Sequence, residues 1–213
     1  MKMIMLELFS GTGRMAQAFT NLGATSITID NAYPSNFNAD ILTLTRDDII
    51  YICGGEPNVI WMGTPCTGFS VASIGKHWGG GKGAYIPKTQ TALLGMALAK
   101  KCAEIVGWFP NAIYAIENPR GVLRKLPILA HLPRRTITFC AYGERRMKPT
   151  DIWTNADFWI TPEPCKNGMD CHDAAPRGSR TGTQGLKNAY DRAAYPYAFC
   201  ASFAEAVIAN RGR

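Results

Sequence analysis

The sequence contains no long hydrophobic run. No apolar segment approaches the ~20 residues that a membrane-spanning helix requires, and Glu7 interrupts the one apolar stretch near the N-terminus. We therefore expect neither a membrane anchor nor an export signal. The 213 residues are 46% hydrophobic and 18% charged, which suits one globular domain over residues 1–213. These properties predict a soluble protein that is not exported.

The cysteines form no recognisable disulfide framework. There are seven, an odd number without framework spacing, so we expect free thiols in a reducing compartment. Cys165, Cys171 and His172 could hold zinc with Cys140 or another thiol as the fourth ligand. Structural zinc sites need four ligands, however, and the spacing is not that of a Cys-x-x-Cys pair. We favour ordinary loop residues here and assign no metal ligand.

Acidic residues are outnumbered. The 16 Asp and Glu residues face 23 Lys and Arg, which gives a net charge of +7. Such an excess suits a polyanionic partner, because each neutralised phosphate releases counterions, although it could also serve only solubility. The basic residues cluster in three places: Lys76, Lys82 and Lys88; Arg134, Arg135, Arg145, Arg146 and Lys148; and Arg177 and Arg180.

Short apolar segments alternate with helical patterns along the chain. Strands are expected at 4–9, 25–30, 58–63, 111–117, 135–141 and 151–154, and helices at 13–22, 46–53, 89–108 and 198–210. This alternation predicts an α/β fold, with a mainly parallel sheet covered by helices on both faces. No internal repeat is visible.

The first expected strand leads into a glycine turn, Gly11-Thr12-Gly13, and then a helix. Glycines at such a turn let the backbone approach a ligand, and the helix N-terminus favours polar or anionic ligand groups. The second strand ends at Asp30, which is placed to accept hydrogen bonds from ribose hydroxyls. Asp40 could bind an adenine amino group. Together these residues predict a nucleotide-like ligand.

Two further strands end in chemically reactive residues. Val59–Met62 leads into Thr64-Pro65-Cys66, which places a thiol at a strand end, where it is either a nucleophile or a packed side chain. The strand at 111–117 ends in Glu117, whose carboxyl either holds or donates a proton beside that thiol or merely caps the strand.

Taken together, these motifs resemble those of the DNA cytosine-5 methyltransferase family. Phe9–Gly13 resembles its first cofactor motif, and Pro65–Ser70 its Pro-Cys-Gln-x-Phe-Ser nucleophile motif. Glu117–Pro119 resembles its Glu-Asn-Val, and Glu144–Lys148 its Gln-x-Arg-x-Arg. The four motifs occur in the family's order over residues 6 to about 150. Ala194-Tyr195-Pro196 and the helix after it loosely resemble the last cofactor-side motif, without its Gly-Asn.

Within these motifs the sequence departs from the family at four positions. Thr67 replaces Gln, Pro119 replaces Val, Glu144 replaces Gln and Lys148 replaces the second Arg. The cysteine, the glutamate and the first arginine remain, so the family's chemistry is expected here.

The resemblance implies a Rossmann-like fold and methyl transfer from S-adenosylmethionine to carbon 5 of cytosine in DNA. It assigns catalysis to Cys66, Glu117 and Arg146. The residues expected at the cofactor are Phe9, Gly11, Thr12, Gly13, Asp30, Asp40 and Pro65. Those expected at the DNA are Ser70, Lys82, Asn118, Lys148, Arg177 and Arg180.

Two segments are expected to contact the DNA. Residues 71–88 are rich in glycine and read as a mobile loop, whose Lys76, His77, Trp78, Lys82 and Tyr85 suit phosphate and base contacts. Residues 161–190 stand where the family has a target-recognition domain, but they are too few for one of ordinary size. They predict a minimal recognition loop, as in phage- or prophage-borne members, some of which belong to restriction-modification systems. We expect the protein in the cytoplasm of a bacterial or phage-infected cell.

Three alternatives remain at this point. The substrate could be cytosine in a free nucleotide, RNA or single-stranded DNA. The chain could be a non-catalytic module that binds S-adenosylmethionine or DNA, which the retained Cys66 and Glu117 argue against. A Rossmann oxidoreductase is disfavoured because Ala16 stands where a third glycine is required.

Overall fold

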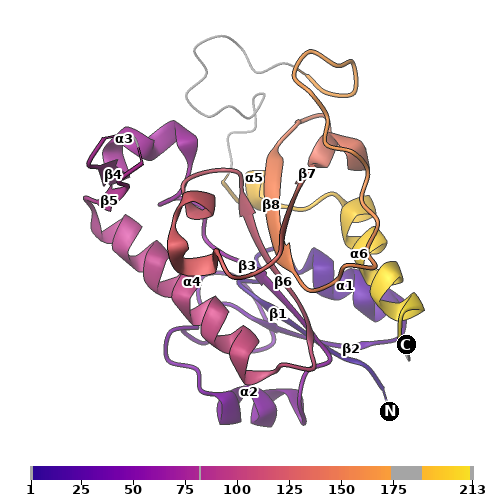
Figure 1. Ribbon diagram of the computed structural model, residues 1–213. Helices are drawn as coiled ribbons and strands as arrows, with labels where there is room; N and C mark the ends of the chain where they lie inside the picture. Colours follow the sequence, from indigo (N-terminus) through magenta and orange to yellow (C-terminus); the bar gives the residue numbers. More distant parts are fainter. Residues whose placement is uncertain (1, 82, 174–188, 212–213) are drawn as a thin grey trace.

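The computed structural model describes residues 2–81, 83–173 and 189–211 and is built around a six-stranded sheet (Figure 1). The strand order is β2-β1-β3-β6-β8-β7. The strands are β1 Ile4–Leu8, β2 Thr25–Ile29, β3 Val59–Gly63, β6 Ile113–Pro119, β7 Arg134–Thr138 and β8 Pro149–Thr154. The first four in this numbering are mutually parallel, and β8 is antiparallel to both of its neighbours. The expected mainly parallel sheet is confirmed.

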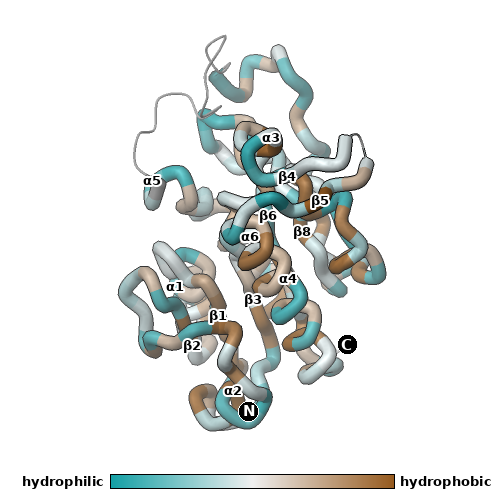
Figure 2. Tube along the Cα trace, turned by 90° about the vertical axis from the view of Figure 1, so that its left-hand side faces the viewer, coloured by the Kyte–Doolittle hydropathy of each residue, from teal (hydrophilic) through white to brown (hydrophobic). Residues whose placement is uncertain are grey.

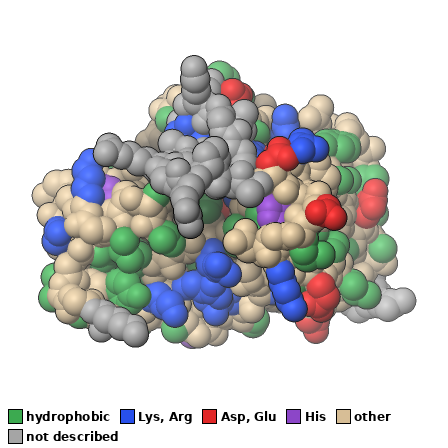
Figure 3. Space-filling view, turned by 90° about the horizontal axis from the view of Figure 1, so that it is seen from above, with side chains coloured by type: hydrophobic (Ala, Val, Ile, Leu, Met, Phe, Trp, Pro, Cys, Tyr) green, Lys and Arg blue, Asp and Glu red, His purple; other side chains and the backbone are tan. Residues whose placement is uncertain are grey.

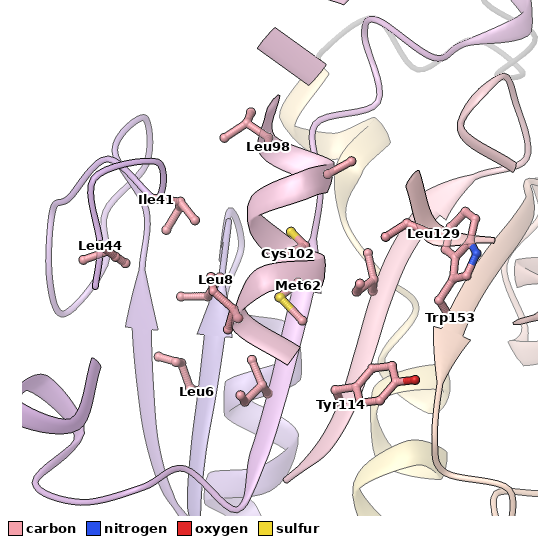
Figure 4. Close-up of a cluster of buried hydrophobic side chains, with 14 of the residues drawn as sticks. Leu6, Leu8, Ile41, Leu44, Met62, Leu98, Cys102, Tyr114, Leu129 and Trp153 are labelled. Carbon is pink, nitrogen blue, oxygen red and sulfur yellow. The ribbon is translucent and has the colours of Figure 1, made fainter. Parts of the chain in front are cut away.

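Helices cover both faces of this sheet (Figure 1). On one face lie α1 Arg14–Asn21 and α6 Tyr197–Ala209, and on the other lie α2 Arg46–Cys53 and α4 Gln90–Trp108. Phe19 of α1 packs edge-on against Phe203 of α6, with ring centroids 6.1 Å apart. Cys102 of α4 and Met62 of β3 belong to the apolar layer on the other face of the sheet, shown in Figure 4. The sheet is therefore buried on both sides.

Double burial explains why the strands could be located in the sequence. Val59, Ile60, Trp61 and Met62 are all buried, as expected for a central parallel strand covered on both faces, and β1 and β3 are largely brown in Figure 2. The observed bounds differ from the expected ones by at most three residues, at the end of β7 (138 against 141). Among the described helices, none is both long and apolar enough to cross a membrane.

The strand order of the sheet reverses at β1. From β1 the chain passes to β2 on one side, whereas β3 lies on the other side of β1. Ligands of open α/β sheets bind outside the carboxyl ends of the strands at such a reversal. The loops after β1, β3 and β6 therefore meet at one edge of the sheet, the upper edge in Figure 1.

The described residues of 71–88, which exclude Lys82, contain regular structure where a loop was expected. They form η1 Val71–Ser73, α3 Ile74–His77 and an antiparallel pair, β4 Trp78–Gly79 and β5 Ile86–Pro87. The indole of Trp78 is buried, donates to the Gly68 carbonyl at 2.6 Å and stacks on Phe69. His77 is also buried, with its Nδ1 2.7 Å from the Thr89 hydroxyl. The expectation that His77 and Trp78 contact a base or phosphate is therefore wrong, because both side chains pack inside.

Candidate active site

Hydrogen bonds lock the loop after β3 to the end of β6. Gly63 pairs with Glu117 in the parallel register. The backbone and hydroxyl of Thr64 both donate to the Glu117 carbonyl, at 3.1 and 3.0 Å. In return, the Asn118 amide donates to the carbonyl and hydroxyl oxygens of Thr64 at 3.1 and 3.0 Å. Because Cys66 follows Thr64 by two residues, these bonds hold the thiol close to the Glu117 side chain.

The Glu117 carboxyl is buried and asymmetrically bonded. Its Oε2 accepts a hydrogen bond of 3.0 Å from the Tyr195 hydroxyl. Its Oε1 is buried and has no hydrogen-bond partner among the described residues. Burial raises the pKa of Glu117, an effect that Lys148 and the Tyr195 bond oppose and that the nearby Asp151 reinforces. The carboxyl therefore keeps its proton at a higher pH than an ordinary glutamate, which suits a proton donor.

The Cys66 residue is exposed, although protein atoms displace much of the water around its sulfur. This desolvation raises the pKa of Cys66, and the charge of Glu117 raises it further. Lys148 and Arg192 act in the opposite direction. Since the thiolate is the nucleophilic form, these two cations favour the reactive state of the sulfur.

Arg146 and Lys148 are the two cationic residues of the fourth motif. The charge of Lys148 lowers the pKa of both Cys66 and Glu117. Its ammonium donates to the Arg192 carbonyl at 3.0 Å and lies 4.6 Å from the centre of the Phe139 ring. Burial lowers the pKa of Lys148, whereas the charge of Glu117 raises it. Lys148 was expected at the DNA, and in the structure its charge also favours the thiolate form of Cys66.

Arg146 is instead held by its own motif. The side chain is buried and donates to Glu144 Oε2 at 2.7 Å and to the Arg192 carbonyl at 3.2 Å. Its Nε has no hydrogen-bond partner within the described part of the chain. The replacement of Gln by Glu at position 144 thus gives Arg146 an ionic partner inside the protein.

Tyr195 is the site residue that sequence reasoning missed. Its buried hydroxyl accepts from the Trp61 indole at 3.3 Å and donates to Glu117. A Cβ on Gly63 would overlap that hydroxyl, so the glycine at the end of β3 is required by the tyrosine. Tyr195 lies 78 residues from Glu117. The signals in the sequence were its place before the apolar helix α6 and the loose resemblance of Ala194-Tyr195-Pro196 to the family's last cofactor-side motif.

On the cofactor side, the glycine turn has an unusual backbone. Phe9, Gly11 and Gly13 have φ of +55°, +49° and +64°, a region that favours glycine. The Asp30 carboxylate accepts from the backbone N–H of Gly11 at 2.9 Å and from those of Ala32 and Tyr33 at 2.7 and 3.0 Å. It therefore ties the turn to the end of β2, a role that sequence reasoning did not assign to it.

This turn fits a nucleoside-containing cofactor. Ser10 Oγ is buried without a hydrogen-bond partner among the described residues, and a Cβ built on Gly13 would meet nothing within 4 Å. Open space and a spare polar atom thus lie at a helix N-terminus beside Asp30. Asp40 is exposed and accepts from the Leu42 N–H at 3.0 Å, and Pro65 is exposed next to Cys66.

The expected DNA contacts are distributed unevenly. Ser70 accepts from the Ala72 N–H at 3.3 Å and so caps η1, while Lys82, Arg177 and Arg180 lie outside the described residues. The structure adds basic residues that were not anticipated. A concave surface next to η1 is lined by Val71, Ile74, Tyr85, Arg120, Gly121, Val122, Arg124 and Lys125. Lys and Arg side chains spread across the face where the parallel strands end (Figure 3).

Comparison with known proteins supports the family resemblance. No family model matches the chain. It is 27% identical over 173 residues to a protein of Frog virus 3 (isolate Goorha) named as a probable DNA (cytosine-5)-methyltransferase, covering 79% of this chain and 78% of the relative. The similarity to the DNA cytosine-5 methyltransferase family inferred from the motifs is confirmed.

A solved structure supports the fold. A methyltransferase of Entamoeba histolytica matches 78% of this chain with a TM-score of 0.54 at 13% identity. This chain covers 57% of that one, so it spans little more than half of its structural neighbour. The chain has the α/β fold of a methyltransferase.

Proposed function

We propose that this chain is an enzyme that transfers a methyl group from S-adenosylmethionine to carbon 5 of cytosine in DNA. The observation that carries the proposal is the meeting of Cys66, Glu117 and Lys148 where β3 and β6 end, beside the glycine turn after β1. The similarity to the viral relative, which is named for this activity, points the same way.

The residues present fit the steps that this chemistry needs. Carbon 5 of cytosine is a poor nucleophile until the Cys66 thiolate adds to carbon 6, which forms an S–C6 bond and moves an electron pair toward carbon 5. Glu117 donates its proton to N3 as charge builds on the ring. Lys148 favours ionisation of the sulfur before the attack, against the desolvation that raises the pKa of Cys66. Once carbon 5 carries the methyl group, solvent water takes the carbon 5 proton, and the electron pair left behind re-forms the C5–C6 double bond. The S–C6 bond breaks and releases the Cys66 thiolate, and the N3 proton returns to Glu117.

The cofactor would be held by the turn at Phe9–Gly13 and by Asp30, with Asp40 and Pro65 at the margins. S-adenosylmethionine, when bound, supplies an electrophilic methyl group. The polar residues of the turn would bind its nucleoside portion, and β1 lies next to β3, the strand that leads to Cys66. Toward the cofactor, the chain's contribution would therefore be orientation.

DNA is the proposed substrate because of charge and shape. A cytosine in a duplex cannot reach Cys66 and must flip out, which costs a few kcal/mol of stacking and pairing. Phosphate contacts must offset that cost, and the +7 charge with Arg120, Arg124 and Lys125 near η1 suits them. Arg146 would contact the base itself, as the family resemblance implies.

Covalent trapping tests the proposal. DNA that contains 5-fluorocytosine should form a stable adduct with the wild type in the presence of S-adenosylmethionine, because fluorine cannot leave as the proton does. Cys66→Ala should form none. Cys53→Ala, which removes a buried thiol elsewhere, should trap as the wild type does. Equal trapping by Cys66→Ala would show that another residue is the nucleophile.

The alternative substrate is cytosine in a free nucleotide, RNA or single-stranded DNA. It is favoured by the short stretch at 161–190, which cannot form a recognition domain of ordinary size. Methyl transfer to dCMP, a single-stranded oligonucleotide and a duplex should be compared in parallel. Transfer to dCMP without transfer to duplex DNA would support this alternative, whereas cofactor binding without any transfer would indicate a non-catalytic module.

A further inference from the structure

A cluster of potential metal ligands lies beyond the active site, at the end of β7. Cys140 belongs to η4 Phe139–Tyr142, and Cys165, Cys171 and His172 belong to the segment that follows β8. One donor atom from each of the four lies within 4.8 Å of every other. The chain therefore brings three sulfurs and an imidazole together from two separate segments.

The local backbone holds this arrangement in place. The N–H of Cys165 donates to the Thr138 hydroxyl at 2.9 Å, and the N–H of Asp173 donates to the Arg145 carbonyl at 2.8 Å. Between these anchors the chain turns at Gly168, with φ of +90°. The turn returns Cys171 and His172 to the side of Cys165, so the cluster does not depend on side-chain reach alone.

A disulfide is the competing description. The sulfurs of Cys165 and Cys171 are in contact and are paired as a disulfide, which departs from the expectation of seven free thiols. Their Cα atoms are 7.9 Å apart, however, whereas disulfides ordinarily hold Cα atoms about 4.4–6.8 Å apart. A disulfide also gives no reason for the sulfur of Cys140 and the ring of His172 to converge on the same point.

We propose that Cys140, Cys165, Cys171 and His172 bind one zinc ion. Tetrahedral zinc with Zn–S of about 2.3 Å and Zn–N of about 2.0 Å places its ligands roughly 3.5–3.8 Å from one another. All four donor atoms lie within 4.8 Å of one another, and reduction of the Cys165–Cys171 contact lets those two sulfurs separate to that spacing. Three thiolates and one imidazole fill all four positions and leave none for a substrate. The site is therefore structural.

Three thiolates with Zn²⁺ carry one net negative charge. The residue after His172, Asp173, is paired with the guanidinium of Arg145 at 2.8 Å, so its carboxylate adds no unpaired negative charge next to the cluster. Sequence analysis favoured ordinary loop residues because no Cys-x-x-Cys pair is present. The fourth ligand comes from a helix 25 residues before Cys165 (165 minus 140), which spacing alone does not predict.

The zinc ion would fasten residues 165–172 to the loop that carries Arg145 and Arg146. This segment leads directly into residues 174–188, which contain Arg177 and Arg180. The ion would thus hold the start of the proposed recognition loop next to the active-site motif. The proposal about zinc does not depend on the proposed activity, because metal content is measured without a substrate.

Elemental analysis tests the site. Protein produced with zinc in the medium and purified under reducing conditions without chelator should hold about one zinc per chain. Cys140→Ser, Cys171→Ser and His172→Ala should each hold less than about a tenth of that after dialysis against a weak chelator. Cys53→Ala, a thiol outside the cluster, should keep its zinc. His172 is only half-buried, so His172→Ala should retain the fold, as circular dichroism would verify.

A second readout identifies the ligands. Cobalt(II) added to metal-free reduced protein should give tetrahedral d–d bands and sulfur-to-cobalt charge-transfer absorption. With cobalt in enough excess to fill the weakened site, Cys140→Ser should reduce that absorption by about one third, since one thiolate of three is lost. The proposal is overturned if the reduced wild type takes up neither zinc nor cobalt. It is equally overturned if peptide mapping finds a Cys165–Cys171 disulfide and zinc content is unchanged in Cys140→Ser and His172→Ala.

Discussion

The Tyr195 hydroxyl accepts a hydrogen bond from the Trp61 indole and donates one to Glu117. Because the indole can only donate, it leaves the tyrosine proton to face the carboxyl. Tyr195 therefore sets both the direction of the carboxyl and its affinity for a proton. It is a positioning residue, since it acts through Glu117.

Replacing Tyr195 with Phe should raise the pKa of Glu117, because the hydrogen bond from Tyr195 now lowers it. If Glu117 acts as the proton donor, the alkaline limb of the kcat profile should move to higher pH. The rate at neutral pH should also fall, because the carboxyl loses the hydrogen bond that sets its direction. The measurement is kcat as a function of pH on a duplex substrate.

Tyr142→Phe is the matched control, since Tyr142 packs on Phe199 in the same aromatic cluster. It is not one of the described residues that shift the pKa of Glu117. The substitution should leave the pH profile in place. A Tyr195→Phe enzyme with an unshifted profile would mean that the bond to Glu117 has no role in proton transfer.

At the scale of elements, β3 and the segment before α6 meet at one atom, the Tyr195 hydroxyl oxygen, which lies against Gly63. A Cβ on Gly63 would overlap the Tyr195 hydroxyl but lie 3.5 Å from the tyrosine Cζ. Gly63→Ala should therefore lower the free energy of unfolding by about 1–3 kcal/mol through overpacking. In a Tyr195→Phe background the same substitution should cost less than about 1 kcal/mol, since the overlapping atom is gone.

Urea unfolding of the two single variants and the double variant measures this coupling. Gly107→Ala in α4 provides the comparison, because its Cβ would meet nothing within 4 Å and alanine favours the helix. Additive effects of Gly63→Ala and Tyr195→Phe would contradict the predicted contact.

A second element-scale prediction concerns the buried acid of β1. Glu7 Oε2 accepts from the Ala16 N–H in α1 at 2.8 Å, and burial raises the pKa of Glu7 from 4.5 to about 8. Between these values the folded protein holds a proton that the unfolded chain releases. The free energy of unfolding should therefore fall as pH rises through this window.

The expected loss between pH 5 and pH 8 exceeds about 1 kcal/mol, since each pKa unit corresponds to 1.36 kcal/mol. Thermal melts across this range should show it, and Glu7→Gln, which stays neutral, should flatten the curve. A wild-type curve as flat as that of Glu7→Gln would place the carboxylate in a better-solvated setting.

The strands and long helices could be predicted because burial on two faces leaves continuous apolar runs such as Val59–Met62. The proposed catalytic pair could be located because parallel strands carry Cys66 and Glu117 to the same edge. The contacts of Tyr195 and Trp78 could not be predicted, because they depend on how the side chains pack in three dimensions and no sequence spacing indicates them. Trp78 looks like a base-stacking residue until Gly68 and Phe69 are seen to receive it.

At the scale of the whole molecule, Lys and Arg side chains lie on the face where the parallel strands end (Figure 3). If DNA affinity comes mainly from phosphates, binding should weaken steeply with salt, and the logarithmic slope should reflect the number of contacts. Replacing Arg177 and Arg180 together with Ala should reduce that slope by roughly 2, and Arg120→Ala by about 1. Fluorescence anisotropy with a duplex across a salt series measures it.

Lys2→Ala is a suitable control, since Lys2 is exposed at the start of β1, away from the carboxyl ends of the parallel strands. Its slope should match that of the wild type. An affinity insensitive to salt would argue against phosphate contacts and favour a free-nucleotide substrate.

Both ends of the segment between Asp173 and Arg192 are fastened to one short stretch of chain. Asp173 donates its N–H to the Arg145 carbonyl, and the Arg192 carbonyl accepts from Arg146 and Lys148. The two ends of this segment are therefore both hydrogen-bonded to residues 145–148. A segment anchored in this way can change in length or composition between its two anchors. If it contacts the DNA, new target preferences can arise there while the residues around Cys66 and Glu117 stay the same.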